Sequence, residues 1–170
     1  MKKQSAVWLL VLLSGLALFG CTDTPAELPV SLTEMQNVAE PAEFTPMTRE
    51  KDGVLYTLLG IHPDYVSSGK YAKPKAGYHF VTVKMSYQNN RDTALEVSSL
   101  LMLSAVDGAG NEYPITITVT DLPQSLDGTV APGEALEGYA AFEIPVTAKS
   151  LSVAVKPDLF SEDVLIFPLY

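Results

Sequence analysis

Residues 79–88 alternate between apolar and polar side chains from Val81 onward, and this pattern limits the chain to a small set of folds. The apolar positions of the segment are Val81, Val83, Met85 and Tyr87. A repeat of two residues is typical of a half-buried antiparallel strand, because successive side chains of a strand point to opposite faces. The polar run 89–92 that follows predicts a turn.

Further β-prone runs follow one another from residue 54 onward, without a convincing helix between them. They cover residues 54–61, 100–106, 113–119, 136–144, 151–155 and 164–169. His62-Pro63 should end the first run, and the glycine-rich stretch 107–111 predicts a hairpin. About seven strands joined by such turns predict an all-β, immunoglobulin-like antiparallel β-sandwich, with an open barrel as the alternative.

The N-terminal segment has the order of a secretory signal. Lys2 and Lys3 supply positive charge, and the apolar run 6–19 is too short to span a bilayer comfortably. Gly20 then places a small residue directly before the only cysteine of the chain.

Residues 18–21, Leu-Phe-Gly-Cys, resemble a bacterial lipobox, in which the cysteine is lipidated and becomes the mature N-terminus. Phe19 departs from that pattern, since a small or β-branched residue is usual there. We predict a signal peptide over residues 1–20 and a membrane anchor at lipidated Cys21, because two or more acyl chains hold a protein firmly on a bilayer. An uncleaved anchor, or a signal cut without lipidation, is the alternative.

Length and composition fit one domain on a tether. Residues 21–48 are rich in proline and acidic side chains, which predicts a disordered tether, and residues 49–170 would form the sandwich. With one cysteine in 170 residues, no internal disulfide can form. Removing residues 1–20 would change the formal charge from −9 to −11, because that segment carries two lysines and no acid. Such a surface repels nucleic acid.

Residues 78–156 resemble the bacterial domain-of-unknown-function family 4352. The matching pieces are the strand 79–85 with Asn90, the strand 101–103 with Asp107-Gly108 and Glu112-Tyr113, and the series Pro132-Gly133-Glu134, Gly138, Phe142-Glu143-Ile144-Pro145 and Leu151-Ser152-Val153. In this series Gly138 would allow a close approach, Phe142 would fill the core and Pro145 would end strand pairing. The resemblance implies an immunoglobulin-like sandwich common in surface lipoproteins, and it brings no catalytic residue or ligand.

Histidine and methionine side chains raise the alternative of a copper site, because thioethers favour Cu(I). The candidates are Met47, His62, His79, Met85 and Met102. His79 and Met85 would lie about 20 Å apart on a regular strand, so they could not share one ion. Core methionines and a hydrogen-bonded histidine are favoured, and neither a metal nor a cofactor is predicted.

Asp107, Asn111 and Glu112 suggest a calcium loop by composition, but the spacing lacks the distal glutamate of an EF-hand. A hairpin turn explains these residues. Asp121 and Asp127 lie in a polar connection and are expected to be solvated loop acids.

The sequence predicts no enzyme activity, since a nucleophile needs a base and an orienting group beside it. Ser67 and Ser68 lie near His62 without the local signature of a nucleophile, and the adjacent Glu162 and Asp163 would point to opposite faces of a strand. No phosphate-binding glycine loop is present.

The loop from residue 65 to residue 78 is the candidate partner-binding segment, because it interleaves lysines and tyrosines in an acidic chain. Its candidate residues are Tyr65, Lys70, Tyr71, Lys73, Lys75 and Tyr78. Loops on a rigid scaffold often carry binding residues. The alternative is a solvated loop whose tyrosines pack on the rim of the sandwich.

These features together predict a lipid-anchored module in the bacterial cell envelope that faces the extracytoplasmic side and has a binding or envelope-structural role. Its partners would be the membrane, through Cys21, and an envelope protein or glycan. The rival interpretations are an extracytoplasmic metal carrier or metallochaperone, and an accessory factor or inhibitor of an envelope enzyme.

Overall fold

The structure is a computed structural model that describes residues 44–157 and 162–170. The predicted signal peptide, Cys21 and the tether up to residue 43 lie outside these residues. Ten strands and one short helix are found in the described part. None of its helices is long and apolar enough to cross a membrane.

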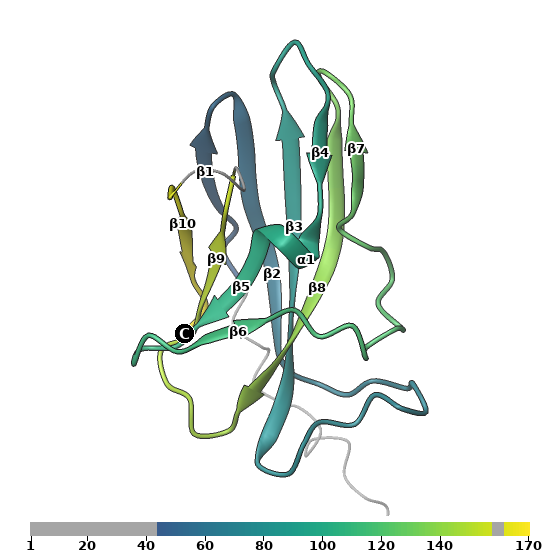
Figure 1. Cartoon of the computed structure of the whole chain (residues 1–170), viewed down its shortest axis with the longest axis vertical. Coiled ribbons are helices and arrows are strands. Elements are labelled where there is room, and N and C mark those ends of the chain that lie inside the picture. Colours follow the sequence, from purple (N-terminus) through teal and green to yellow (C-terminus); the bar gives the residue numbers. More distant parts are fainter. Residues whose placement is uncertain (1–43, 158–161) are drawn as a thin grey trace, which may run out of the picture. The chain divides into compact units, whose positions relative to one another are not determined.

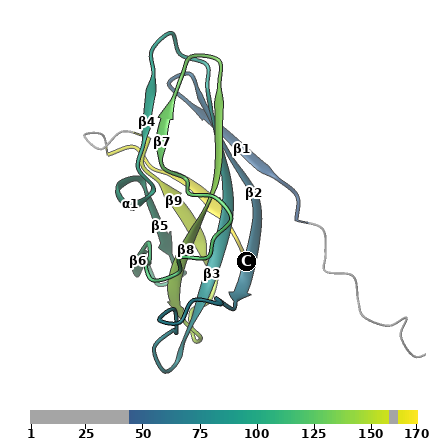
Figure 2. The same cartoon turned by 90° about the vertical axis from the view of Figure 1, so that its right-hand side faces the viewer.

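Two four-stranded antiparallel sheets form the two layers of the fold, which Figure 1 shows face-on and Figure 2 shows edge-on. The first sheet has the order β1-β2-β3-β8 and consists of β1 (Met47–Lys51), β2 (Val54–Tyr65), β3 (Tyr78–Asn89) and β8 (Ala135–Pro145). The second has the order β10-β9-β5-β6 and consists of β10 (Leu165–Pro168), β9 (Ser152–Val155), β5 (Leu103–Val106) and β6 (Glu112–Pro114). A two-stranded sheet pairs β4 (Leu95–Val97) with β7 (Gly128–Val130), and α1 (Ser99–Met102) precedes β5. The prediction of an all-β, immunoglobulin-like sandwich is confirmed.

The inward face of β3 is the one that its alternating sequence predicts. Val81, Val83, Met85 and Tyr87 are each at most 1% exposed. The neighbours of β3 are antiparallel to it and supply the same kind of face. The pairing with β8 is continuous, and that with β2 shifts register between Leu58 and Gly60 and between His62 and Tyr65. The fully buried side chains that complete the centre of the core include Tyr56, Leu58, Phe142, Ile144, Leu151, Val153 and Phe167.

Three strand boundaries differ from the prediction. His62-Pro63 does not end β2, which continues to Tyr65 across a register shift between His62 and Tyr65. A bulge accommodates the proline, which has no N–H to donate to the ladder. Residues 99–102 form α1 where a strand was expected, and β6 ends at Pro114, well before residue 119.

Three further strands have no clear signal in the sequence, namely β1, β4 and β7. The strands β4 and β7 have three residues each, too few for a readable alternation. The first two residues of β1, Met47 and Thr48, are the last two of the predicted tether.

The outer edge of β8 is covered by the chain that leaves β6. Ile115 forms a β-bridge with Phe142, and the Thr116 N–H donates to the Ala141 carbonyl at 2.8 Å. On the opposite side of the sandwich, side chains join β1 to the C-terminal region. Arg49 Nε donates to the Ile166 carbonyl at 2.9 Å, and Lys51 Nζ lies 2.9 Å from a carboxylate oxygen of Asp163.

Gly138 makes the close approach that its position in the sequence series predicts. A Cβ at this position would lie 2.6 Å from the Leu126 backbone nitrogen, closer than real Cβ atoms come to backbone. The segment that fills this space is hydrogen-bonded to β8, since the Tyr139 N–H donates to the Gln124 carbonyl at 2.9 Å. Phe142 is fully buried and β8 ends at Pro145, so the expected positions of these two residues are also observed.

Candidate functional site

The loop between β2 and β3 is held against the rest of the domain by Asp121. Ser67 Oγ donates to one carboxylate oxygen of Asp121 at 2.6 Å, and the Ser68 N–H and Oγ donate to the other at 2.6 and 2.8 Å. These hydrogen bonds, that of Ser67 above all, lower the pKa of Asp121 to about 2. The expectation of a solvated loop acid is therefore wrong for Asp121, which ties two segments 54 residues apart in the chain.

Apolar contacts on the outer face of the first sheet support the same loop. Phe80 and Ala141 point away from the main core and are buried with Ala72 of the loop and Val119 of the long β6–β7 connection. Phe80 is only 2% exposed although it lies on the face of β3 opposite to the main core. The loop therefore has a fixed base on the sheet.

The six candidate residues of this loop divide into two groups. Tyr65 is partly buried, and Lys70, Tyr71 and Lys73 are exposed, with Tyr71 at 83%. Lys70 Nζ lies 5.4 Å from the centre of the Tyr71 ring. Lys75 and Tyr78 line one groove, and none of the other four residues lines it.

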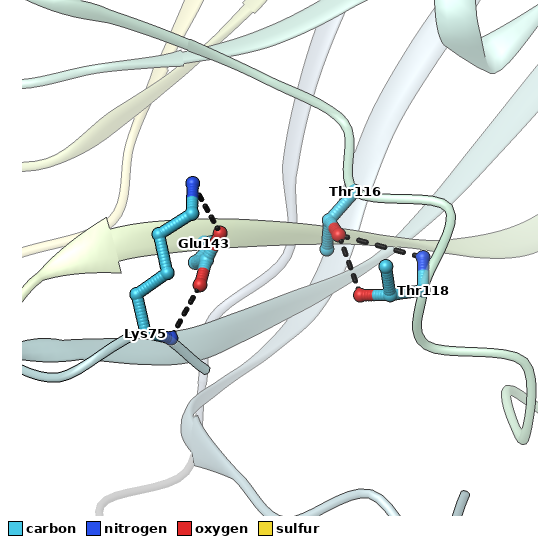
Figure 3. A network of polar contacts seen from close by, with 4 residues as sticks. All are labelled: Lys75, Thr116, Thr118 and Glu143. Carbon is cyan, nitrogen blue, oxygen red and sulfur yellow. Dashed lines mark hydrogen bonds and ion pairs between the residues drawn. The ribbon is translucent and has the colours of Figure 1, made fainter. Parts of the chain in front are cut away.

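This groove, called here the Lys75–Glu143 groove, has a volume of about 410 Å³. Its polar lining comes from Lys75, Tyr78, Tyr113, Thr116, Thr118 and Glu143. Figure 3 shows four of these side chains: Lys75 from the loop, Glu143 from β8, and the two threonines from the connection after β6. Three separate parts of the chain therefore meet at one hollow: residues 75–78 at the end of the loop and the start of β3, residues 113–118, and Glu143 of β8.

Lys75 and Glu143 are joined by two contacts. The Lys75 N–H donates to Glu143 Oε1 at 2.7 Å, and Lys75 Nζ lies 3.2 Å from Oε2. The side chain of Lys75 is 75% exposed and that of Glu143 is 20% exposed, so the pair forms an accessible wall of the groove. Beside it, the hydroxyls of Thr116 and Thr118 are 2.8 Å apart and share a hydrogen bond (Figure 3).

Tyr113 is fixed at the edge of the groove by the β5–β6 hairpin. Its hydroxyl donates to Asp107 Oδ2 at 2.8 Å, which raises the pKa of Tyr113. Asp107 also accepts hydrogen bonds from the Ala109 N–H, the Asn111 N–H and the Asn111 side chain. Together these bonds, led by those from the Asn111 and Tyr113 side chains, lower the pKa of Asp107 to about 2.

The turn that contains Asp107 is the hairpin that the sequence predicts. The Asp107 carboxylate accepts hydrogen bonds from this hairpin, namely from Ala109, Asn111 and Tyr113. Four donors share its two oxygens, so little accepting capacity is left for a calcium ion.

Asp127 also holds separate segments together, because it accepts hydrogen bonds from Ser99 and Ser125. Burial acts to raise the pKa of Asp127, but these hydrogen bonds outweigh it and the pKa is lowered. Asp127 is exposed, as expected of a loop acid, but the sequence did not indicate these hydrogen bonds.

The other residues weighed for metal or catalytic roles are dispersed. Met85 and Met102 are buried in the core, and His79 Nδ1 lies 2.6 Å from Asp64 Oδ1. The His62 ring packs edge-on against the Tyr65 ring. Within residues 44–157 and 162–170, no three His, Cys, Asp or Glu side chains come together as a metal site requires.

Glu143, Thr116, Thr118 and Tyr113 belong to the groove but were not identified from the sequence as binding candidates. Glu143 is one of the polar positions in the alternation of β8, which marks it as outward-facing and nothing more. Its neighbour Lys75 is 68 residues away in the chain. Only the pairing of β3 with β8 brings the loop and Glu143 together.

A second hollow, of about 460 Å³, lies beside β4 and α1. Its floor is largely apolar, formed by Leu95, Val97 and Met102 with the partly exposed Leu101 at its edge. It shares no lining residue with the Lys75–Glu143 groove.

A family described as Domain of unknown function (DUF4352) has a sequence model that matches residues 52–165. Among solved structures, the putative lipoprotein ycdA from Bacillus subtilis aligns with a TM-score of 0.59 and 14% identity, over 72% of this chain and 38% of that chain. A conserved hypothetical protein from Bacillus anthracis has a TM-score of 0.54 and 16% identity, over 73% and 92% of the two chains. The yjhA protein from Bacillus subtilis has a TM-score of 0.54 and 12% identity, over 73% and 96%.

At these identities the likeness to solved structures shows the fold alone. The aligned region spans little more than a third of the ycdA chain. No curated protein matches this chain in sequence.

Proposed function

We propose the function of this chain from its own residues, because it belongs to the family described as Domain of unknown function (DUF4352), which carries no assigned activity. The protein is a lipid-anchored, extracytoplasmic module that binds a partner at the Lys75–Glu143 groove. The observation that carries the proposal is the groove itself. It joins an accessible ion pair to tyrosine rings at a place where three parts of the chain meet.

Exposed apolar side chains near the groove support a binding role. Ile117 lines it and is 76% exposed, and Tyr78 lines it and is 37% exposed. Val146, which is 62% exposed, lies next to the loop because its N–H donates to the Gly77 carbonyl at 2.9 Å. Apolar side chains gathered at the rim of a concave site are typical of surfaces that a partner covers.

The anchoring half of the proposal is supported by the sequence from Lys2 to Cys21 and by the description of ycdA as a putative lipoprotein. In the proposed mechanism, lipid holds Cys21, residues 22–46 give reach, and the rigid sandwich presents the groove. No step of this mechanism requires catalysis.

Site-specific photo-crosslinking in intact cells tests the binding half. A benzophenone amino acid at Ile117 should give a discrete crosslinked species at the groove. The matched control is the same amino acid at Leu101, which is 56% exposed and lines the separate hollow beside α1. Equal crosslinking from both positions, or none from Ile117, would contradict a protein partner at the groove.

Labelling with a fatty acid analogue tests the anchoring half. Wild-type protein should incorporate label and Cys21→Ser should not, with the variant accumulating as unprocessed precursor. Processed protein should also lack tryptophan fluorescence, because the only tryptophan is Trp8. Normal labelling of Cys21→Ser, or tryptophan emission from the mature form, would overturn lipidation at this cysteine.

A further inference from the structure

We infer that the Lys75–Glu143 groove binds a neutral oligosaccharide, an inference that rests on the proposed function and specifies its ligand. The argument starts from charge. Among the residues that line the groove, Lys75 and Glu143 are the charged ones, and they carry opposite signs. The groove is therefore polar but has no net charge of its own.

This balance disfavours charged ligands. A phosphate or carboxylate drawn to Lys75 would meet the Glu143 carboxylate, which lies 3.2 Å from the ammonium group. An ammonium ligand would meet Lys75 in the same way. A fully apolar ligand would remove the ion pair from water without replacing its hydrogen bonds, which is costly.

The remaining hydrogen-bonding capacity matches hydroxyl groups. Lys75 Nζ has three donors, of which Glu143 engages one, and each Glu143 oxygen accepts one bond from Lys75 and has a further lone pair. The hydroxyls of Thr116 and Thr118 bond to each other, and the Thr118 N–H also donates to Thr116 Oγ1 at 3.4 Å, which leaves one hydroxyl proton and about two lone pairs free. The groove therefore offers donors and acceptors side by side. Adjacent sugar hydroxyls need this combination, because each one both donates and accepts.

Tyr78 supplies the apolar surface that a sugar ring also requires. A pyranose presents axial C–H groups on its face, and the electron-rich face of an aromatic ring attracts such weakly positive hydrogens. Lys75 Nζ lies over the Tyr78 ring, 5.8 Å from its centre, so the ring is adjacent to the ion pair and a sugar would stack on the part of the ring that Lys75 leaves open. The volume of about 410 Å³ lies within the range of small-molecule sites and exceeds that of one sugar ring, which favours a chain of sugars.

Binding of defined tetrasaccharides to the full-length protein tests the inference. The protein is kept in a detergent without a sugar headgroup, and calorimetric titrations use a glucose tetrasaccharide, an N-acetylglucosamine tetrasaccharide and a sulfated oligosaccharide. At least one neutral tetrasaccharide should bind saturably, with an affinity little changed between low and high salt. The sulfated compound should bind at least tenfold more weakly.

Two variants assign the binding to the groove. Lys75→Met removes the ammonium group but keeps the backbone N–H that donates to Glu143, and it should weaken binding at least tenfold. Thr118→Val removes one exposed hydroxyl and should weaken it about threefold, the equivalent of roughly 0.6 kcal/mol of a lost hydrogen bond. The matched control is Glu137→Gln, which disrupts the Lys84–Glu137 pair between β3 and β8, outside the groove. It should leave binding unchanged.

Three results would overturn the inference. They are absence of binding to every neutral tetrasaccharide, preference for the sulfated compound, and equal affinity in wild type and Lys75→Met. If a protein is instead crosslinked from Ile117 while the tetrasaccharides do not bind, the sugar inference fails and the proposed binding function stands. If neither occurs, both fail.

Discussion

The side-chain amide of Asn89 donates to the Val130 carbonyl at 2.9 Å, which ties the end of β3 to β7 across 41 residues of chain. The same amide donates to the Thr93 carbonyl, and the side-chain oxygen accepts from the Arg91 N–H. Asn89 is fully buried, so all three bonds replace contacts with water. One side chain therefore fixes the β3–β4 turn and the β4–β7 ribbon together.

Replacing Asn89 with alanine should lower the free energy of unfolding by about 2–4 kcal/mol, because buried backbone groups lose their partners. Denaturant unfolding followed by circular dichroism measures this change. The neighbouring Asn90→Ala is the control, since Asn90 is exposed and makes no side-chain hydrogen bond among those found in the described residues. Similar losses in both variants would refute the role given to Asn89.

Gly138→Ala should destabilise the domain by about 1–3 kcal/mol or more, because the added methyl group would lie 2.6 Å from the Leu126 nitrogen and the backbone there must move. Thermal unfolding should show a lower midpoint. Gly60→Ala in the same sheet is the comparison, since a Cβ there meets nothing within 4 Å. A Gly138→Ala midpoint equal to that of Gly60→Ala would show that the close approach is not a constraint.

Acid should loosen the loop between β2 and β3. The pKa of Asp121 is about 2 in the folded chain, below its ordinary value of 3.8, so its contribution to stability is present above about pH 4 and is lost as the pH falls towards 2. The contribution of Asp107 to stability should be lost over the same pH range, because its pKa is also about 2.

Urea unfolding between pH 5 and pH 2 should therefore show a fall in stability that is smaller in Asp121→Asn than in wild type. The control is Asp92→Asn, because Asp92 is exposed and accepts no hydrogen bond that is found within the described residues. An unchanged pH dependence in Asp121→Asn would mean that the Ser67 and Ser68 bonds do not stabilise the fold.

Tyr87→Phe should leave the stability unchanged or raise it by about 1 kcal/mol, because the Tyr87 hydroxyl is buried without a hydrogen-bond partner among the described residues. Its ring packs edge-on against Tyr56, with 4.9 Å between ring centres, and phenylalanine keeps this contact. Tyr113→Phe is the contrast, since it removes the hydroxyl that donates to Asp107 and should lower stability. Chemical denaturation of the two variants distinguishes them, and a destabilised Tyr87→Phe would indicate a partner for that hydroxyl.

Much of the sandwich could be predicted because its long strands bury one face and alternate visibly. The inward positions of β3, β8 and β9 are those indicated by period two, and Gly138 was identified by its place in the family series. The interruption of 100–106 by α1 could not be predicted, because this run is apolar apart from Ser104 and has no period that distinguishes a helical turn from a strand.

The site was predicted in part. Lys75 and Tyr78 line the groove, whereas Lys70, Tyr71 and Lys73 of the same loop do not. A composition contrast locates a loop but does not say which of its side chains meet another segment. The hydrogen bonds of Asp121 and Asp127 could not be predicted for a similar reason, since most of their serine donors (Ser67, Ser68 and Ser99) lie 28 to 54 residues away in the chain.

The covering of β8 by residues 115 and 116, and the bonding of Arg49 and Lys51 to the C-terminal region, bear on how neighbouring copies behave. Exposed strand edges are the usual route by which β proteins zip together into aggregates. Copies confined to a surface would collide often and in similar orientations. A fold whose edge strands already contact other parts of the same chain can be packed densely on such a surface without polymerising.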